Sequence, residues 1–188
     1  RDSKTSKLTG EQIRDGWLKH IKNKEENFLW VSNQRALDLM ISGVVPPGTS
    51  DPKNNPDFDM IDAQLTTEIF GFYSPGRPDF ATEMADLPIR TTARFNAEWI
   101  SKFYVSMYSL AANPDPNLNV KENLLIIAEK SRNQLPVDSY ASKMYDFIKK
   151  QYNEGKPWEI IRDNVYQRYQ VDQKDGYDNS TISKEEIE

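Results

Sequence analysis

The chain has 188 residues, a net charge of −5 and 37% hydrophobic residues, which is typical of one acidic globular domain with a substantial core. The negative charge argues against binding nucleic acid through a basic face. No apolar run approaches the length of a membrane span, so we expect a soluble protein. The absence of cysteine excludes disulfides, thiolate catalysis and zinc sites built on sulfur.

The only histidine is His20, which excludes metal sites made of several histidines and disfavours Ser-His catalysis. It falls beside the apolar stripe of its helix, so we expect it at the surface. The chain begins at Arg1 rather than at methionine, and its first residues say nothing about a signal peptide or a compartment.

Helical periodicity begins near the N-terminus, where Thr9 to Gln12 reads as a capping box. The second helix carries Ala36, Leu37 and Met40, and Gly43 is expected to end it with a left-handed cap. A third helix is expected to begin at Asp59 as its cap and to end at Gly71.

The second half of the chain has the same periodicity. We expect five further helices: a short one over Asp79 to Ala85 that Pro88 interrupts, a strongly apolar one over Thr92 to Ala112, one capped by Asn119 and Glu122 that ends before Leu135-Pro136, one from Asp138 to Gly155, and one from Pro157 through Tyr169. The helix over Thr92 to Ala112 is expected to be central and covered on most sides, since Phe95, Trp99 and Phe103 follow one face.

These patterns predict an all-α protein with a single helical bundle over residues 1–171. No alternating strand pattern of useful length and no internal repeat are found. Residues 172–188 are polar and are expected to form a tail or linker without fixed structure.

The stretch from Gly43 to Pro78 is the best candidate for a site. Two turn-forming clusters, Pro46-Pro47-Gly48 and Ser74 to Pro78, bracket a short helical pattern, and prolines of this kind fix the shape of a loop. A long polar loop within a helical chain is more often a binding site than a linker.

Acidic residues in this loop raise the question of a metal site. Asp51, Asp57, Asp59 and Asp62 are close in sequence, but an EF-hand that begins at Asp51 would place proline at the glycine position. Capping and turn formation explain these aspartates more simply. An EF-hand pattern over Asp175 to Glu186 and a glycosylation sequon at Asn179 are interpreted as chance matches.

The loop and its neighbours together resemble the ADP-ribosylglycohydrolase family. The similar residues are Leu8 to Glu11, Trp17, Ala36, Gly43, Pro46-Pro47-Gly48, Asn55, Ile61 to Leu65, Glu68 to Gly71, Ser74 to Pro78, Ala81, Phe103 to Ala112, Leu135-Pro136, Ser139, Trp158 and Tyr169. They cover about Leu8 to Val171 as several separate pieces in order.

The resemblance implies an all-α fold and hydrolysis of the glycosidic bond between ADP-ribose and a protein side chain or small molecule. It also implies a pair of magnesium ions, held by aspartates and a threonine, that position substrate and water. Neither of the family's metal motifs is found in these residues, and Thr92-Ala93 stands where many members have Ser-His. We therefore expect either the middle of a longer enzyme or a divergent member, and assign no catalytic or metal-binding residue.

Five residues are expected to bind the ligand: Gly48, Asn55, Asp62, Gln64 and Glu68. The resemblance places them along the substrate cleft, with Gly48 allowing close backbone approach and Asn55 bonding a ribose or phosphate. Gln64 and Glu68 share a helix face at i, i+4. The alternatives are that these residues only make turns and join helices, and that the chain is a non-catalytic relative that binds a nucleotide-like ligand or a protein partner.

Overall fold

The regular secondary structure of the described residues is all helical. The computed structural model describes residues 7–21 and 28–177, and no strand occurs among them. The all-α prediction is thus confirmed, while membership of the ADP-ribosylglycohydrolase fold stays a prediction. Within the described ranges, no helix has the length and apolar character needed to cross a membrane.

Backbone contacts group the chain into two compact units, Arg1–Gln134 and Leu135–Glu188. The first unit contains α1 (Gly10–His20), α2 (Val31–Ile41), the 3-10 turn η1 (Gly48–Ser50), α3 (Asp62–Thr67), α4 (Ile69–Phe72), α5 (Pro78–Ile89), α6 (Phe95–Ala111), α7 (Val120–Ser131) and the 3-10 turn η2 (Arg132–Gln134). The second unit contains α8 (Tyr140–Asn153), α9 (Trp158–Val165) and the π-helical turn η3 (Tyr166–Val171). The single helical bundle that the sequence predicts over residues 1–171 stays a prediction.

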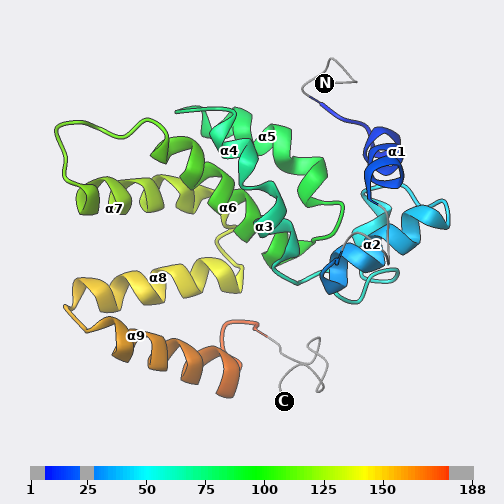
Figure 1. The fold of residues 1–188 in the computed structure, drawn as a ribbon. Coiled ribbons are helices and arrows are strands. Elements are labelled where there is room, and N and C mark those ends of the chain that lie inside the picture. Colours follow the sequence, from blue (N-terminus) through cyan, green and yellow to red (C-terminus); the bar gives the residue numbers. More distant parts are fainter. Residues whose placement is uncertain (1–6, 22–27, 178–188) are drawn as a thin grey trace. The chain divides into compact units, whose positions relative to one another are not determined.

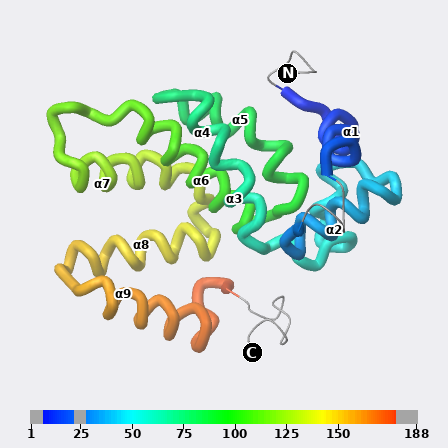
Figure 2. The backbone as a smooth tube through the Cα atoms, in the orientation of Figure 1, coloured from blue at the N-terminus to red at the C-terminus, as the bar shows by residue number. Residues whose placement is uncertain are grey.

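Helix α6 is the centre of the first unit. It contacts α3, α4 and α5, and also α7 and η2, while α1 packs on α2 (Figures 1 and 2). The cluster of buried hydrophobic side chains in this unit is made mainly of alanine: Ala63, Ala81, Ala85, Ile89, Ala93, Ala97 and Val105. Because most of these side chains are alanine, the helix backbones approach one another closely.

The aromatic stripe of α6 is partly buried, and its first residue, Phe95, is exposed. The buried residues of α6 are Ala97, Ser101, Val105, Ser106 and Ser109, whereas Phe95 is 52% exposed. The expectation of a central helix covered on most sides agrees with its contacts, since Trp99 and Phe103 are half-buried, while small side chains occupy the closest helix contacts. The helix also begins at Phe95 rather than at Thr92, since Phe95 has a φ of +52° that interrupts helical geometry.

Several helix ends follow from local sequence. Capping boxes form at Thr9 with Gln12 and at Asn119 with Glu122, as predicted. Gly43 has a φ of +97°, which agrees with the expected left-handed cap. His20 lies in the last turn of α1 and is exposed, as expected.

Other helix ends differ from the prediction. Asp59 does not cap α3, because its Oδ1 instead accepts a hydrogen bond from the backbone N–H of Ala97 in the first turn of α6 (3.2 Å). Helix α4 continues through Gly71 to Phe72. Helix α5 contains Pro88 and ends one residue later; a proline this close to the C-terminus removes only one helical hydrogen bond.

Ion pairs join α5 to α6. The Lys102 Nζ lies 2.6 Å from Asp86 Oδ1 and 2.7 Å from Glu98 Oε1. Burial alone would raise the pKa of Asp86, but the hydrogen bonds and charges of Lys102 and Arg90 outweigh burial and hold the pKa below its usual value. Burial opposes the charge of Lys102 in the same way, and its two carboxylate partners nevertheless raise its pKa.

Stability should depend on pH through this cluster. Because the folded pKa of Asp86 is lowered, its contribution is present above the unfolded value near 3.8 and is lost as pH falls through the folded pKa. We expect the Lys102→Met variant to lose less stability than the original chain between about pH 6 and about pH 3 in urea unfolding curves. Equal losses for the two proteins would contradict this role for Lys102.

In the second unit, α8 contacts α9, and an aromatic cluster forms around the buried Tyr169. Burial and the hydrogen bond from its hydroxyl to Asp175 (2.9 Å) raise the pKa of Tyr169 to about 12. Arg168 also pairs with Asp175, at 2.9 Å. Residues 172–177 thus contact the second unit rather than separating from it, and the rest of the expected tail lies outside the described residues.

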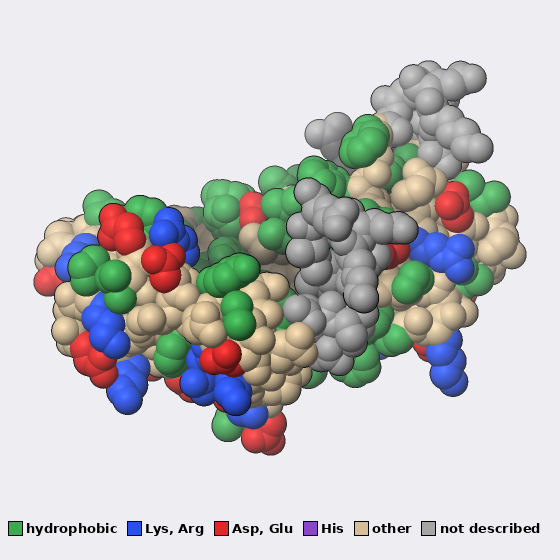
Figure 3. Space-filling view, turned by 90° about the horizontal axis from the view of Figure 1, so that it is seen from below, with side chains coloured by type: hydrophobic (Ala, Val, Ile, Leu, Met, Phe, Trp, Pro, Cys, Tyr) green, Lys and Arg blue, Asp and Glu red, His purple; other side chains and the backbone are tan. Residues whose placement is uncertain are grey.

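Large hydrophobic side chains are also exposed on helix faces. On α3 and α4, Leu65, Ile69 and Phe72 are each about half exposed (51%, 46% and 53%). Figure 3 shows one face of the molecule, where hydrophobic side chains (green) are interspersed with charged ones. Exposed apolar residues that recur along one helix are more informative than scattered ones, because they are typical of a binding surface.

Candidate ligand-binding site

The loop after α2 is fixed against the connection between α5 and α6. The Thr49 hydroxyl donates to the backbone oxygen of Thr91 (2.7 Å), and the Ser50 hydroxyl donates to that of Arg90 (2.6 Å). From the other side, Arg94 donates to the Pro47 carbonyl (2.6 Å). The loop therefore has a defined shape, which agrees with its proline content, and its polar side chains are used inside the protein.

Gly48 begins η1 and is half-buried. A Cβ atom at this position would meet only the Val44 Cγ1, at 3.3 Å. Glycine is thus not required here by a positive φ or by close contact with another backbone, and Gly48 acts as a turn residue. Close approach of a ligand to Gly48 stays a prediction.

Asn55 is fully buried. Its Nδ2 donates to the carbonyl oxygens of Ser32 (3.3 Å) and Thr49 (3.2 Å), and its Oδ1 accepts from the backbone N–H of Asp57 (3.1 Å). The amide thereby ties α2 to the loop. In this structure the Asn55 side chain presents no surface to a ligand. The alternative that Asn55 only joins parts of the fold therefore explains all of its contacts.

Asp62 is also buried, with 2% of its surface exposed. Its Oδ2 accepts hydrogen bonds from the backbone N–H and the hydroxyl of Ser32 (2.9 and 2.7 Å) and from the backbone N–H of Asn33 (3.1 Å). The residue before α2 is Trp30, whose side chain makes no capping hydrogen bond. Asp62 therefore caps α2 from a distant part of the chain, where a negative charge is favourable.

Gln64 and Glu68 lie on one helical face and are half-buried. The Gln64 Nε2 donates to Glu68 Oε1 (3.3 Å). A hydrogen bond to Glu68, together with its negative charge, raises the pKa of the Tyr108 hydroxyl on α6. Glu68 thus bonds the Gln64 amide and lies close to the Tyr108 phenol at an accessible position. Of the five expected residues, Gln64 and Glu68 bond each other, while Asn55 and Asp62 are both bonded to Ser32.

Two further aromatic residues lie near Tyr108, one in ring contact with it and one on the same helix. The ring centroids of Phe72 and Tyr108 are 4.9 Å apart with an interplanar angle of 44°, and Tyr104 is exposed on the preceding turn of α6. Sequence reasoning did not select Tyr108. Its i, i+4 spacing from Tyr104 is a signal that could have indicated a shared polar-aromatic face on α6. We call Gln64, Glu68, Phe72, Tyr104 and Tyr108 the Glu68 cluster.

The described carboxylates do not fit a pair of magnesium ions. In the described ranges, no group of three or more Asp, Glu or His side chains is placed to hold a metal. In the loop, Asp51 Oδ1 accepts from the backbone N–H of Lys53 (2.9 Å), while Asp59 and Asp62 accept backbone hydrogen bonds of α6 and α2. No step of a reaction is therefore assigned to magnesium at these residues.

The EF-hand pattern interpreted as a chance match begins at Asp175, whose carboxylate already bonds Arg168 and Tyr169. The remainder of that pattern, and the sequon at Asn179, lie outside the described residues. Comparison with models of protein families, with curated proteins and with solved structures finds no match to this chain.

Proposed function

We propose that this chain is the substrate-binding part of an ADP-ribosylglycohydrolase-like hydrolase that acts on ADP-ribosyl or related N- or O-glycosidic bonds. The observation that supports the proposal is the Glu68 cluster, a hydrogen-bonded carboxylate beside aromatic rings on an accessible surface. A carboxylate accepts hydrogen bonds from the paired hydroxyls of a ribose. An aromatic ring stacks on a purine base, which contributes about 1–3 kcal/mol per base.

Different residues of the Glu68 cluster bind the sugar and the base. Glu68 accepts from sugar hydroxyls with the oxygen lone pairs that Gln64 and Tyr108 leave open, and these two partners fix its orientation. Phe72 and Tyr104 offer exposed ring faces to the base. The chain thus binds and orients the nucleotide, and the proposal assigns no proton transfer to these residues.

Glu68→Gln tests the proposal. The amide keeps the size of the side chain and an acceptor oxygen, but loses the charge. We expect the dissociation constant for ADP-ribose, measured by isothermal titration calorimetry with magnesium present, to rise about tenfold or more, since a hydrogen bond to a charged group contributes about 1.5–3 kcal/mol. Tyr108→Phe keeps the ring but loses the hydroxyl, and it is expected to raise the dissociation constant for ADP-ribose about two- to tenfold.

Glu159→Gln is the matched control, because Glu159 is an exposed glutamate in the first turn of α9 in the other unit. It should leave ADP-ribose binding unchanged. An original chain that does not bind ADP-ribose at millimolar concentration, or a Glu68→Gln variant that binds as well as the original, would contradict the proposal. Release of free ADP-ribose from an ADP-ribosylated protein then separates a hydrolase from a protein that only binds.

A second candidate is a non-catalytic protein that binds a protein partner. The half-exposed apolar side chains of Leu65 and Ile69 next to Glu68 favour it, since such residues are enriched where proteins associate. The binding experiment decides between the candidates: partner binding predicts that Leu65→Ser disrupts an association while ADP-ribose has no measurable affinity.

A further inference from the structure

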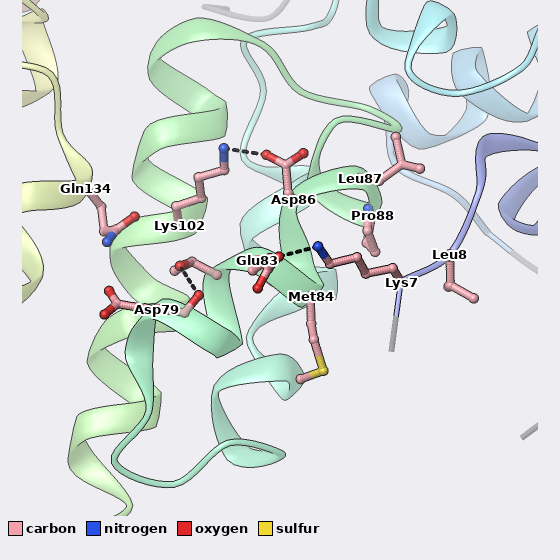
Figure 4. A pocket seen from close by; sticks show the side chains of 11 residues that line it. Lys7, Leu8, Asp79, Glu83, Met84, Asp86, Leu87, Pro88, Lys102 and Gln134 are labelled. Atoms are coloured by element: carbon pink, nitrogen blue, oxygen red, sulfur yellow. Dashed lines mark hydrogen bonds and ion pairs between the residues drawn. The ribbon is translucent and has the colours of Figure 1, made fainter. Parts of the chain in front are cut away.

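A pocket of about 500 Å³ lies in the first unit, away from the Glu68 cluster. Its walls come from the segment before α1, from the whole length of α5, from α6 and from the end of η2 (Figure 4). It shares no lining residue with the Glu68 cluster. The volume is in the range of pockets that hold small molecules.

Both lysines of the pocket are already paired. Lys7 forms an ion pair with Glu83, and the Nζ of Lys102 lies within 2.7 Å of carboxylate oxygens of both Asp86 and Glu98. The Lys102 side chain is only 19% exposed. An anion entering the pocket would have to displace one of these carboxylates, so the pocket does not fit a phosphate or a carboxylic acid.

One carboxylate in the pocket remains without a partner among the described residues. Asp79 is exposed in the first turn of α5, and only its backbone oxygen is bonded, by the Thr82 hydroxyl (3.1 Å). The three acidic residues that line the pocket outnumber the two lysines, which leaves a net charge of −1. This excess negative charge favours a cationic occupant.

Gln134 adds a second acceptor. Its Nε2 donates to Asn133 Oδ1 (3.3 Å), which directs the amide so that Oε1 has no donor among the described residues. In the view of Figure 4, Gln134 and Asp79 lie at the same side of the pocket, opposite Leu8. Two acceptors on separate side chains suit a compact ammonium, whose three N–H donors point in different directions.

The remaining walls are apolar. Leu8, Met84, Leu87 and Pro88 contribute hydrocarbon surface, and Met84 is flexible enough to follow an alkyl chain. We propose that this pocket binds a primary alkylammonium group, with the ammonium at Asp79 and Gln134 and the methylene chain along the apolar walls. The group belongs either to a free diamine or polyamine or to the lysine side chain of another protein.

Calorimetry with cadaverine (1,5-diaminopentane) tests the site on the whole chain at low ionic strength. We expect cadaverine to bind and 1,5-pentanediol, which has the same chain without charge, to bind at least about tenfold more weakly. Asp79→Asn keeps the shape of the exposed side chain and should weaken cadaverine binding by about tenfold or more, because the charge that pairs with the ammonium is lost. Glu159→Gln should have no effect.

Two further measurements keep the result interpretable. The methyl resonance of Met84, assigned with Met84→Leu, should shift on titration, which places the ligand in this pocket without relying on a variant. Nα-acetyl-lysine methylamide, run in parallel, distinguishes a lysine side chain from a free amine by which of the two binds more tightly. Equal affinity for cadaverine and pentanediol, unchanged affinity in Asp79→Asn, or an unmoved Met84 resonance would overturn the proposal. ADP-ribose binding at Glu68 has no bearing on it.

Discussion

Replacing Asp62 with alanine is expected to lower the free energy of unfolding by about 3–5 kcal/mol. The carboxylate is 2% exposed and accepts three hydrogen bonds at the start of α2, two from backbone N–H groups and one from the Ser32 hydroxyl. Alanine would leave all three donors buried without a partner, and it would remove the charge that stabilises the helix N-terminus. Urea unfolding followed by circular dichroism measures the loss.

Asp62→Asn is the informative comparison. All three hydrogen bonds go to one carboxylate oxygen, which the asparagine carbonyl oxygen can replace, so only the charge at the helix N-terminus is lost and we expect a smaller loss of stability than for Asp62→Ala. Asp38→Ala is the matched control, because Asp38 lies on the exposed side of α2 and bonds only Gln34 at i, i+4. A loss for Asp62→Ala no larger than that for Asp38→Ala would show that Asp62 does not hold α2.

The same variants address ligand binding by Asp62. The sequence places Asp62 among the expected ligand-binding residues, whereas its geometry gives every hydrogen bond a structural purpose. If the fold explains Asp62, Asp62→Asn should bind ADP-ribose as tightly as the original chain at a temperature where both are folded. A tenfold weaker affinity with a retained fold would instead favour the expected role at the ligand.

The helix caps show which features of this fold follow from sequence. Thr9 with Gln12 and Asn119 with Glu122 were predictable because both partners lie within one turn. The contacts of Asp59 and Asp62 were not predictable, because the sequence does not indicate whether an aspartate caps its own helix or a different one. Their partners, Ala97 and Ser32, are distant in the chain, and only tertiary packing brings them together.

In the candidate site, too, local contacts were predictable from sequence and contacts between helices were not. Gln64 and Glu68 were predicted to share a face from their i, i+4 spacing, and their hydrogen bond agrees with that. Tyr108 was not predicted because it comes from α6, and its approach to Glu68 depends on how closely α4 packs on α6. Helix α6 shows the same limit: periodicity identifies its aromatic stripe, but small residues decide which face another helix can approach most closely.

Gly71→Ala is expected to lower the free energy of unfolding by about 2–3 kcal/mol. A Cβ atom at Gly71 would lie 2.6 Å from both the Tyr108 Cβ and the Val105 carbonyl oxygen, and 2.9 Å from the backbone nitrogen of Ser109. Two of these three atoms belong to the backbone of α6, which cannot rotate away as a side chain can. The helices must therefore separate, and the packing around the central helix loosens.

Gly16→Ala supplies the matched control, because Gly16 lies inside α1 and a Cβ there would meet nothing within 4 Å. Alanine is the better helix former, so Gly16→Ala should stabilise the protein by about 0.5–1 kcal/mol, opposite in sign to Gly71→Ala. Separation of α4 from α6 would also move Tyr108 away from Glu68, so Gly71→Ala should weaken ADP-ribose binding below its unfolding temperature while Gly16→Ala does not. Equal affinities in the two folded variants would mean that the contact between Tyr108 and Glu68 does not contribute to the site.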